Sequence, residues 1–433
     1  MIASLSGIRG ILNEDIALTD IARFASNFAE AASDGVFLLA RDTRRTGPAI
    51  SRAVAAEIMA SGRTVLDYGI ISTPALFRES RVKGVPAVMV TASHNEPEYN
   101  GLKFISEGAG IGKETFERVV GKRHAGGRPF GQGRLIRSVR PCYVDSLAEM
   151  YGEGSCAGMR VAVDLGGGAA ISHAVPLLRR LGCEVTSIND AYSVFTRTVD
   201  PVADDLGLLR RTVKAKGCAI GLGFDCDGDR LVIVDSSGRK RSGDYMLTLA
   251  LRRLMRETGE SQAVVSVDTT QAVDEIAREA GGMAFRARVG EANVVRVMRE
   301  KGVRLGGEGS SGGLIDGEFN FCRDSMLAAL AIIRALRDEG DALYSSVPEY
   351  HQERVALRMS RAKAERAFRA LARRYEHPDL SDGLKVALPR RSWVLMRPSG
   401  TEDVVRVSAE APSAARARSI AKEFARKLGG LGS

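Results

Sequence analysis

The 433-residue sequence has few of the features that mark disulfide-stabilised, zinc-binding or membrane proteins. Its six cysteines lie far apart and form no C-x-x-C pair, so neither a zinc site nor a disulfide framework is indicated. No apolar run approaches the roughly 18 residues of a membrane span, and the first ten residues, "MIASLSGIRG", do not have the long apolar core of a signal peptide. We therefore expect reduced thiols and a cytoplasmic protein.

Aromatic residues are also scarce, at 6%, which argues against the basic and stacking surface of a single-strand nucleic-acid binder. The 62 Lys and Arg residues outnumber the 53 Asp and Glu residues and give a net charge of +9. Such a surplus is compatible with nucleic acid, an acidic membrane surface or a phosphorylated small molecule. Because the basic residues look scattered, we predict a phosphorylated small molecule as partner, with neither nucleic acid nor membrane.

Short apolar runs alternate with helix-like segments along most of the sequence. The pattern starts with "VFLLA", a helical segment over 47–62 and "TVLDYG", and it returns over 159–188 and 263–302. Such alternation is typical of βαβ units, so we predict similar α/β domains with mixed, mainly parallel sheets. The final strands and two helices read as a smaller α+β domain. Segments rich in glycine and charge separate these blocks, and we predict four domains at 1–138, 139–240, 241–345 and 346–433.

The segment "GFDCDGDRLVIVD" has the sharpest local pattern. Asp225, Asp227 and Asp229 alternate, and three carboxylates this close repel one another unless a cation lies among them. An EF-hand calcium loop needs Gly and Glu where Arg230 and Ser236 stand, so that interpretation fails. A solvated acidic turn is the alternative, but it fits poorly between two apolar strands. We predict a Mg²⁺ site, and phosphoryl transfer as its natural chemistry.

A hydroxyl that could take part in phosphoryl transfer follows the apolar run "PAVMV". Ser93 lies between Thr91 and His94 in "TASHNEPEYN", at the end of a predicted buried strand. Loops at the carboxyl ends of parallel strands are where α/β proteins place their chemistry. The alternative is a turn or helix N-cap serine.

Two further loops have residues suited to a phosphosugar. In "RPSGTEDVVRV", hydrogen-bond donors gather around a glycine and suit a terminal phosphate, although a plain turn is the alternative. These donors are Arg397, Ser399, Gly400, Thr401 and Arg406. In "LGGEGSSGGLI", Glu308 with Ser310 and Ser311 suits sugar hydroxyls, although glycine-rich loops are often only loops. By contrast, "DLGGGAAISHAV" does not match a dinucleotide fingerprint, because Ile171 stands where a glycine is needed; we interpret it as a strand-to-helix turn.

Together these motifs resemble the α-D-phosphohexomutases, the family of phosphoglucomutase, phosphomannomutase and phosphoglucosamine mutase. "SGIRG", "ARDTR", "TASHNEPEYNGLKF", "DCDGDR", "GEGSSGG" and "RPSGTED" occur in the family's order along the whole chain. The resemblance implies four domains around a central cleft and a phosphosugar mutase reaction. Ser93 would carry the phosphoryl group, and its phosphate would complete the Mg²⁺ shell of the three aspartates. Hexose 1,6-bisphosphate would be the intermediate and activator.

The resemblance also assigns roles to individual residues. Ser93, Arg9 and His94 would form the catalytic set together with Lys103, the candidate general base, whose pKa would have to be lowered for that role. Arg230 and the residues of the last two loops would bind the substrate. The protein would be a monomer or homodimer.

One loop departs from the pattern of many bacterial relatives, which have "GExSGH" where this chain has "GEGSSGG" with Gly313 near the place of the histidine. The stretch is more similar to archaeal-type phosphoglucosamine mutases, which have "GGEGNGG" followed by "CRD". We therefore expect conversion of glucosamine 6-phosphate to glucosamine 1-phosphate. Glucose or mannose phosphates are the alternative substrates, and a non-catalytic sugar-phosphate sensor is the alternative function.

Overall fold

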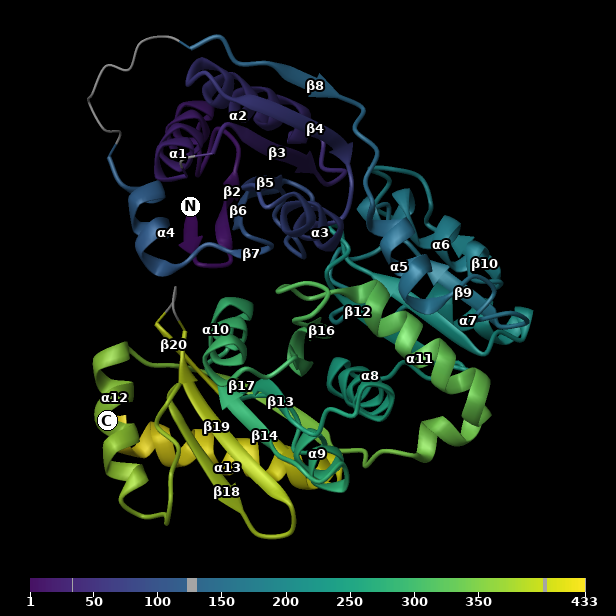
Figure 1. Cartoon of the computed structure of the whole chain (residues 1–433). Coiled ribbons are helices and arrows are strands. Elements are labelled where there is room, and N and C mark those ends of the chain that lie inside the picture. The colour runs from purple at the N-terminus through teal and green to yellow at the C-terminus, as the bar shows by residue number, and fades with distance from the viewer. Residues whose placement is uncertain (33, 123–130, 400–402, 433) are drawn as a thin grey trace.

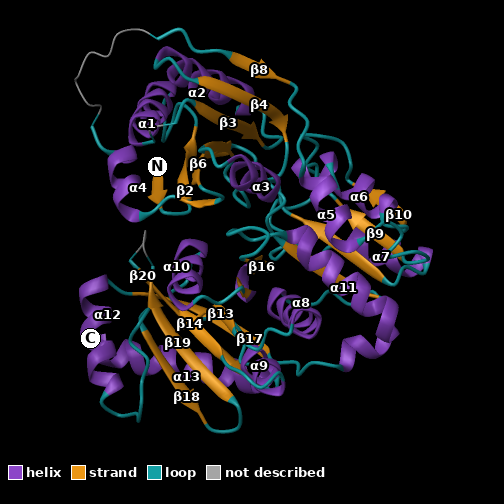
Figure 2. Cartoon of the chain, in the orientation of Figure 1, coloured by secondary structure: helices purple, strands orange, loops and turns teal. Residues whose placement is uncertain are grey.

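Four separate sheets follow one another along the chain (Figure 1). The structure is a computed structural model, and it describes residues 1–433 except 33, 123–130, 400–402 and 433. Helices cover the sheets on their faces (Figure 2). The predicted fold class, three α/β domains and a C-terminal α+β domain, is confirmed; the domain boundaries stay predictions.

The first sheet has the strand order β1-β2-β6-β5-β3-β4-β8, with β7 paired to β6. Its strands are β1 (Ile2–Ser4), β2 (Gly7–Ile11), β3 (Val36–Arg41), β4 (Thr64–Ile70), β5 (Ala87–Val90), β6 (Tyr99–Ser106), β7 (Ala109–Gly110) and β8 (Leu135–Arg137), and its helices are α1 (Leu18–Ala31), α2 (Gly47–Ala60), α3 (Thr73–Lys83) and α4 (Lys113–Val120). β5, β3, β4 and β8 run parallel, whereas β6 returns antiparallel to β5. The parallel strands are the apolar runs of the sequence, because burial on both faces requires such runs.

The second sheet has the order β10-β9-β11-β12. Its elements are α5 (Tyr143–Tyr151), β9 (Arg160–Asp164), η1 (Ala169–Ser172), α6 (Ala174–Arg180), β10 (Glu184–Ile188), α7 (Gly207–Lys216), β11 (Ile220–Phe224) and β12 (Leu231–Asp235). β11 and β12 form an antiparallel hairpin in which Phe224 pairs with Leu231. The motif "DCDGDR" is therefore the hairpin turn, and Gly228 supplies a positive φ of 69° within it. Gly166 and Gly167 also have positive φ and make the expected turn after β9.

The third sheet repeats this arrangement in the order β14-β13-β15-β16. Its elements are α8 (Gly243–Thr258), β13 (Ala263–Ser266), α9 (Ala272–Glu279), β14 (Ala284–Ala287), α10 (Glu291–Lys301), β15 (Leu305–Glu308), η2 (Gly309–Ser311), β16 (Gly313–Asp316), α11 (Ser325–Glu339) and η3 (Gly340–Ser345). In each of the three domains, a central strand (β3, β9 or β13) lies between two parallel neighbours. The second of these neighbours is followed by a hairpin turn and an antiparallel strand (β6, β12 or β16). The loops of Ser93, Asp227 and Ser311 thus occupy equivalent hairpins.

The fourth sheet is antiparallel throughout, in the order β17-β20-β19-β18. Its elements are β17 (His351–Arg358), α12 (Arg361–Ala372), β18 (Leu384–Leu388), β19 (Ser392–Pro398), β20 (Val404–Ala411) and α13 (Ala414–Gly432). The motif "RPSGTED" joins β19 to β20. This topology agrees with the predicted α+β character of the last domain.

The apolar core divides into one large cluster shared by three domains and several smaller clusters, one of which lies within the first domain. A continuous cluster of buried side chains runs through the first three domains and includes Leu76, Leu222 and Leu330. The last domain has its own cluster, made of residues between 364 and 428. A small cluster of Val267, Trp393 and Leu395 joins the third and fourth domains. Among the described residues, no helix has the length and apolar character that a membrane span needs.

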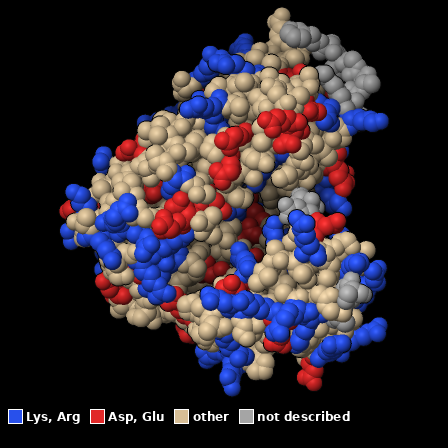
Figure 3. All heavy atoms as spheres, turned by 180° about the vertical axis from the view of Figure 1, so that it is seen from behind, with Lys and Arg blue, Asp and Glu red and all other residues tan. Residues whose placement is uncertain are grey.

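Basic residues occur along the whole chain, but their excess over acidic residues is concentrated near the C-terminus. Residues 355–427 contain 17 Lys and Arg but 8 Asp and Glu, an excess of nine that equals the net charge of the whole chain. Lys and Arg gather over the lower part of the molecule in Figure 3, and a hollow in the same view has acidic side chains on its floor. The net positive charge therefore arises from the last domain, whereas Lys and Arg elsewhere are balanced by Asp and Glu.

Candidate active site

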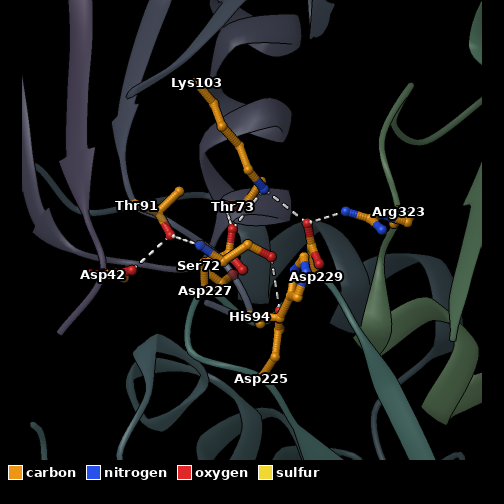
Figure 4. A network of polar contacts seen from close by, with 12 residues as sticks. Asp42, Ser72, Thr73, Thr91, His94, Lys103, Asp225, Asp227, Asp229 and Arg323 are labelled. Carbon is orange, nitrogen blue, oxygen red and sulfur yellow. Dashed lines mark hydrogen bonds and ion pairs between the residues drawn. The ribbon is translucent and has the colours of Figure 1, made fainter. Parts of the chain in front are cut away.

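Hairpin turns of the three α/β domains meet at one place. The Ser93 hydroxyl of the first domain donates to Asp225 Oδ2 of the second domain at 3.1 Å. Arg323 of the third domain pairs with Asp229 at 2.8 Å and donates to Ser311 at 3.1 Å. Side chains separated by more than 200 positions in the sequence thus form one polar cluster (Figure 4).

Ser93 is fully buried in a tight turn. Its φ of 53° is in the left-handed region, which is unusual for a residue other than glycine. Its backbone N–H donates to Thr91 Oγ1 at 2.8 Å, and the Thr91 hydroxyl donates to Asp42 at 2.7 Å. The turn places the Ser93 side chain against Asp225, and this explains why a polar stretch ends a buried strand.

Arg44, the last residue of "ARDTR", binds the backbone carbonyls of the Ser93 turn. Its side chain is fully buried and pairs with Asp42 at 3.0 Å. It donates to the carbonyls of Ser93 and Asn95 at 2.6 Å each, and to that of Tyr99 at 2.9 Å. A guanidinium with several parallel donors can fix a loop of carbonyls in this way.

The aspartate trio, Asp225, Asp227 and Asp229, is fully buried. One carboxylate oxygen from each lies within 4.8 Å of the others, a spacing that one cation can bridge. The Oδ1 atoms of Asp227 and Asp229 are buried without a hydrogen-bond partner among the described residues. Burial, followed by the charges of the other two aspartates, raises the pKa of Asp225 well above its ordinary value. Three oxygen donors with unsatisfied atoms fit a hard divalent metal ion.

Two cationic side chains, Lys103 and Arg323, neutralise charge on the trio, and one hydroxyl donates a hydrogen bond to it. Lys103 Nζ lies 2.7 Å from Asp227 and 2.9 Å from Asp229, and the Thr73 hydroxyl donates to Asp227 at 2.5 Å. Burial alone would raise the pKa of Asp229, but Arg323 and Lys103 outweigh it and lower that pKa.

The arrangement does not lower the pKa of Lys103, as the role of general base would require. Burial acts to lower the pKa, but Asp227 and Asp229 outweigh it and raise the pKa above the ordinary lysine value. Lys103 is therefore a cation paired with two carboxylates, and its assignment as the general base stays a prediction.

Arg9, His94 and Arg230 lie around the same cluster. Arg9 donates to Asn95 at 2.9 Å, Arg230 pairs with Asp200 at 3.1 Å, and His94 Nε2 lies 3.4 Å from Arg230 Nη2. Burial, then the charges of Arg230 and Arg9, lowers the pKa of His94 to about 2, so its ring is neutral. His94 Nδ1 and Arg230 Nε are buried without partners among the described residues, as expected of donors kept for a ligand.

The sugar loop, residues 307–313, lies on the third-domain side. Glu308 is buried, and its carboxylate accepts from the Gly290 N–H at 2.6 Å; burial raises its pKa. Ser311 contacts Arg323, and Ser310 faces a separate pocket of about 490 Å³. Glu291, at the start of α10, lines a pocket of about 430 Å³ between the first and third domains.

The predicted phosphate loop lies partly outside the described residues, because Gly400 and Thr401 are not described. Arg397 and Arg406 face each other across β19 and β20, and Arg397 pairs with Asp382 at 2.9 Å. Ser399 N–H donates to the Val404 carbonyl at 2.7 Å. Among the described residues, Arg397 and Arg406 make no hydrogen bond or ion pair with the aspartate trio. The prediction that they bind phosphate stays untested.

Three residues of the cluster were not predicted as site residues. Arg44 and Arg323 lie within quoted motifs, "ARDTR" and "CRD", so a charged residue in each motif was a usable signal. Thr73 lies in no motif, and its contact with Asp227 spans 154 positions. Sequence spacing contains no signal for a contact of that kind.

Comparison with known domain families matches almost the whole chain. The matches carry the descriptions phosphoglucomutase/phosphomannomutase alpha/beta/alpha domain I at residues 2–125, domain II at 141–238, domain III at 242–353, and C-terminal domain at 355–427. A "Probable phosphoglucosamine mutase" of Methanopyrus kandleri is 33% identical and covers 97% of this chain and 96% of its own. A "Phosphoglucomutase/phosphomannomutase" of Thermococcus kodakarensis is 30% identical over 95% of each chain.

Solved structures show the same architecture. A phosphoglucomutase/phosphomannomutase family protein from Burkholderia thailandensis has a TM-score of 0.85 at 26% identity, covering 99% of this chain and 98% of that one. The N-acetylphosphoglucosamine mutase of Aspergillus fumigatus, in complex with GlcNAc-6P and magnesium, has a TM-score of 0.56 at 16% identity and covers 92% and 83%. The second likeness concerns the fold alone.

Proposed function

This chain belongs to the phosphoglucomutase/phosphomannomutase family, and we propose that it moves phosphate between the 6- and 1-positions of a hexose through a phosphoserine at Ser93. The observation that carries the proposal is the 3.1 Å contact between the Ser93 hydroxyl and a buried aspartate trio. Phosphoryl transfer depends on positioning and on neutralising charge, and this arrangement provides for both.

The trio would hold Mg²⁺, which would neutralise charge on the transferred phosphoryl group. Ser93 Oγ would carry that group. Its O–P bond breaks as a hexose hydroxyl oxygen bonds to phosphorus, and the hydroxyl proton leaves to a base. The resulting hexose 1,6-bisphosphate turns over in the cleft and returns its other phosphate to Ser93. Arg9 and Arg230, on the Ser93 side of the cluster, would orient the phosphosugar.

For the sugar, we propose glucosamine 6-phosphate as the preferred substrate and glucosamine 1-phosphate as the product. The support is the glycine-rich sugar loop followed by "CRD", together with relatives named phosphoglucosamine mutase. Glucose and mannose phosphates are the alternatives, because a relative at 30% identity is named phosphoglucomutase/phosphomannomutase.

A coupled assay with the 6-phosphates of glucosamine, glucose and mannose, Mg²⁺ and a trace of hexose 1,6-bisphosphate tests both the mutase reaction and the choice of sugar. We expect the highest kcat/KM for glucosamine 6-phosphate. Faster turnover of glucose or mannose phosphate would show that the choice of sugar is wrong. A chain without removable phosphate on Ser93 by intact-mass analysis, and inert after bisphosphate priming, would instead favour the sugar-phosphate sensor.

A further inference from the structure

We propose that Arg323 is a positioning residue that fixes the sugar loop relative to the aspartate trio. The inference rests on the proposed function, because its main readout is mutase turnover. It concerns a residue of the third domain that contacts no predicted reacting atom and acts through the two loops that it joins.

Gly313 and Arg323 compete for the same space. A Cβ atom added at Gly313 would lie 2.2 Å from Arg323 Cδ and 2.5 Å from Cγ, distances that real side chains do not reach. Gly313 pairs with Glu308 across β15 and β16, so the Arg323 side chain lies over this hairpin. A residue with a side chain at position 313 and Arg323 in its present place exclude each other. The Arg323 side chain can therefore occupy this place only because residue 313 is a glycine.

The Arg323 guanidinium binds partners from three segments. Nη2 lies 2.8 Å from Asp229, Nη1 donates to Ser311 Oγ at 3.1 Å, and Nε lies 3.2 Å from Glu291. Glu308 is 3.6 Å from Nη1. Figure 4 shows the side chain directed at Asp229. A planar fork of donors can hold several oxygens at fixed mutual positions, which a lysine cannot do.

The fold itself does not depend on this contact alone. Leu231 N–H donates to the Gly312 carbonyl at 2.9 Å, so a backbone hydrogen bond already joins the hairpin turns of the second and third domains. Arg323 therefore adds control over side chains: it sets the position of Asp229 relative to Ser311 and Glu308. Because the Arg323 side chain is only 8% exposed, its charge is held by these partners and not by water.

The consequence for catalysis follows from geometry. A sugar held by the sugar loop must present its hydroxyl to a phosphoryl group held beside the trio. Misplacement of reacting atoms by about 1 Å can cost on the order of 100-fold in rate. We expect Arg323→Gln to lower kcat by about 100-fold, because glutamine cannot span Asp229 and Ser311. Arg323→Lys should recover about tenfold of that loss by restoring the charge without the fork.

The test compares these variants with Arg304→Gln. Arg304 makes a two-bond pair with Asp316 at 2.9 Å in the same hairpin, so its loss controls for a broken ion pair that is remote from the cluster. We expect Arg304→Gln to retain kcat. Titration calorimetry should find Mg²⁺ affinity in Arg323→Gln equal to or tighter than in wild type, since Asp229 loses a competing cation. Gly313→Ala should also lower kcat, because its Cβ displaces Arg323 without removing the charge.

Three results would overturn the inference: kcat of Arg323→Gln equal to that of Arg304→Gln, weakened Mg²⁺ binding that accounts for the whole loss, or wild-type turnover in Gly313→Ala. A wild-type protein that turns over no hexose phosphate would overturn the proposed function and this inference with it. An active wild type with an unaffected Arg323→Gln would overturn this inference alone.

Discussion

Lys103→Met tests the electrostatic basis of the site. The lysine ammonium contacts two fully buried carboxylates, Asp227 and Asp229, at 2.7 and 2.9 Å. A divalent ion bound by the trio would neutralise the same carboxylates. Methionine keeps most of the apolar volume and removes the charge, so it separates packing from electrostatics.

The magnitude follows from burial. The Lys103 side chain is 9% exposed and both carboxylates are 0% exposed, so the pair lies where removing one partner costs about 3–5 kcal/mol. We expect Lys103→Met to lose about that much stability in EDTA. Mg²⁺ at about 100 times its Kd stabilises a binding-competent protein by about 2.7 kcal/mol. Because the variant lacks the competing ammonium, its Kd for Mg²⁺ should be lower than that of wild type. Its loss of unfolding free energy relative to wild type should therefore be smaller in Mg²⁺ than in EDTA.

The assay is urea unfolding in EDTA and in Mg²⁺, with Kd from titration calorimetry. Lys385→Met is the matched control: that lysine donates to the Val267 carbonyl and lies over the Trp393 ring, and burial lowers its pKa to about 7. Replacing Lys385 should change the free energy of unfolding by the same amount with and without Mg²⁺. A Lys103→Met protein as stable as wild type in EDTA, or with a deficit that Mg²⁺ does not change, would refute the reasoning.

Three further predictions concern single residues. Ser93→Ala should abolish mutase activity and removable phosphate while urea unfolding stays near wild type; retained activity would exclude Ser93 from the reaction. Thr73→Val should cost about 1.5–3 kcal/mol in urea unfolding, because Asp227 loses its hydroxyl donor at 2.5 Å; an unchanged midpoint would contradict this. Burial, then Glu410, raises the pKa of Asp244 from 3.8 to about 7, so the stability it contributes in acid is lost as pH rises through 7. Asp244→Asn should therefore gain stability over wild type at pH 8 and not at pH 4; an equal gain at both would be inconsistent with this pKa.

The fold was predictable because local patterns and tertiary burial agree. Runs such as "PAVMV" and "CAIGLGFD" are buried strands, and the change of pattern near residue 346 marks the all-antiparallel sheet. Strand order and the equivalence of the three hairpins were not predictable, since pairing partners lie far apart in sequence. The excess of basic residues in the last domain can be counted directly from the sequence.

The site was predictable where a motif holds the chemistry within a few residues, as for Ser93 and the aspartate trio. It was not predictable where function depends on partners from other domains. The pKa of Lys103 depends on two aspartates more than 120 positions away, and the position of Arg323 depends on a glycine ten residues before it. Such effects follow from three-dimensional contacts and not from residue type.

The separate apolar core of the last domain has a consequence for how the protein unfolds. Among the described residues from 351 onward, its only apolar cluster shared with the rest is the small one around Trp393. Water can therefore enter between this domain and its neighbours at little hydrophobic cost. In native-state hydrogen exchange, amides of β17 to β20 should open as one cooperative unit, at a lower free energy than the strands of the other three sheets.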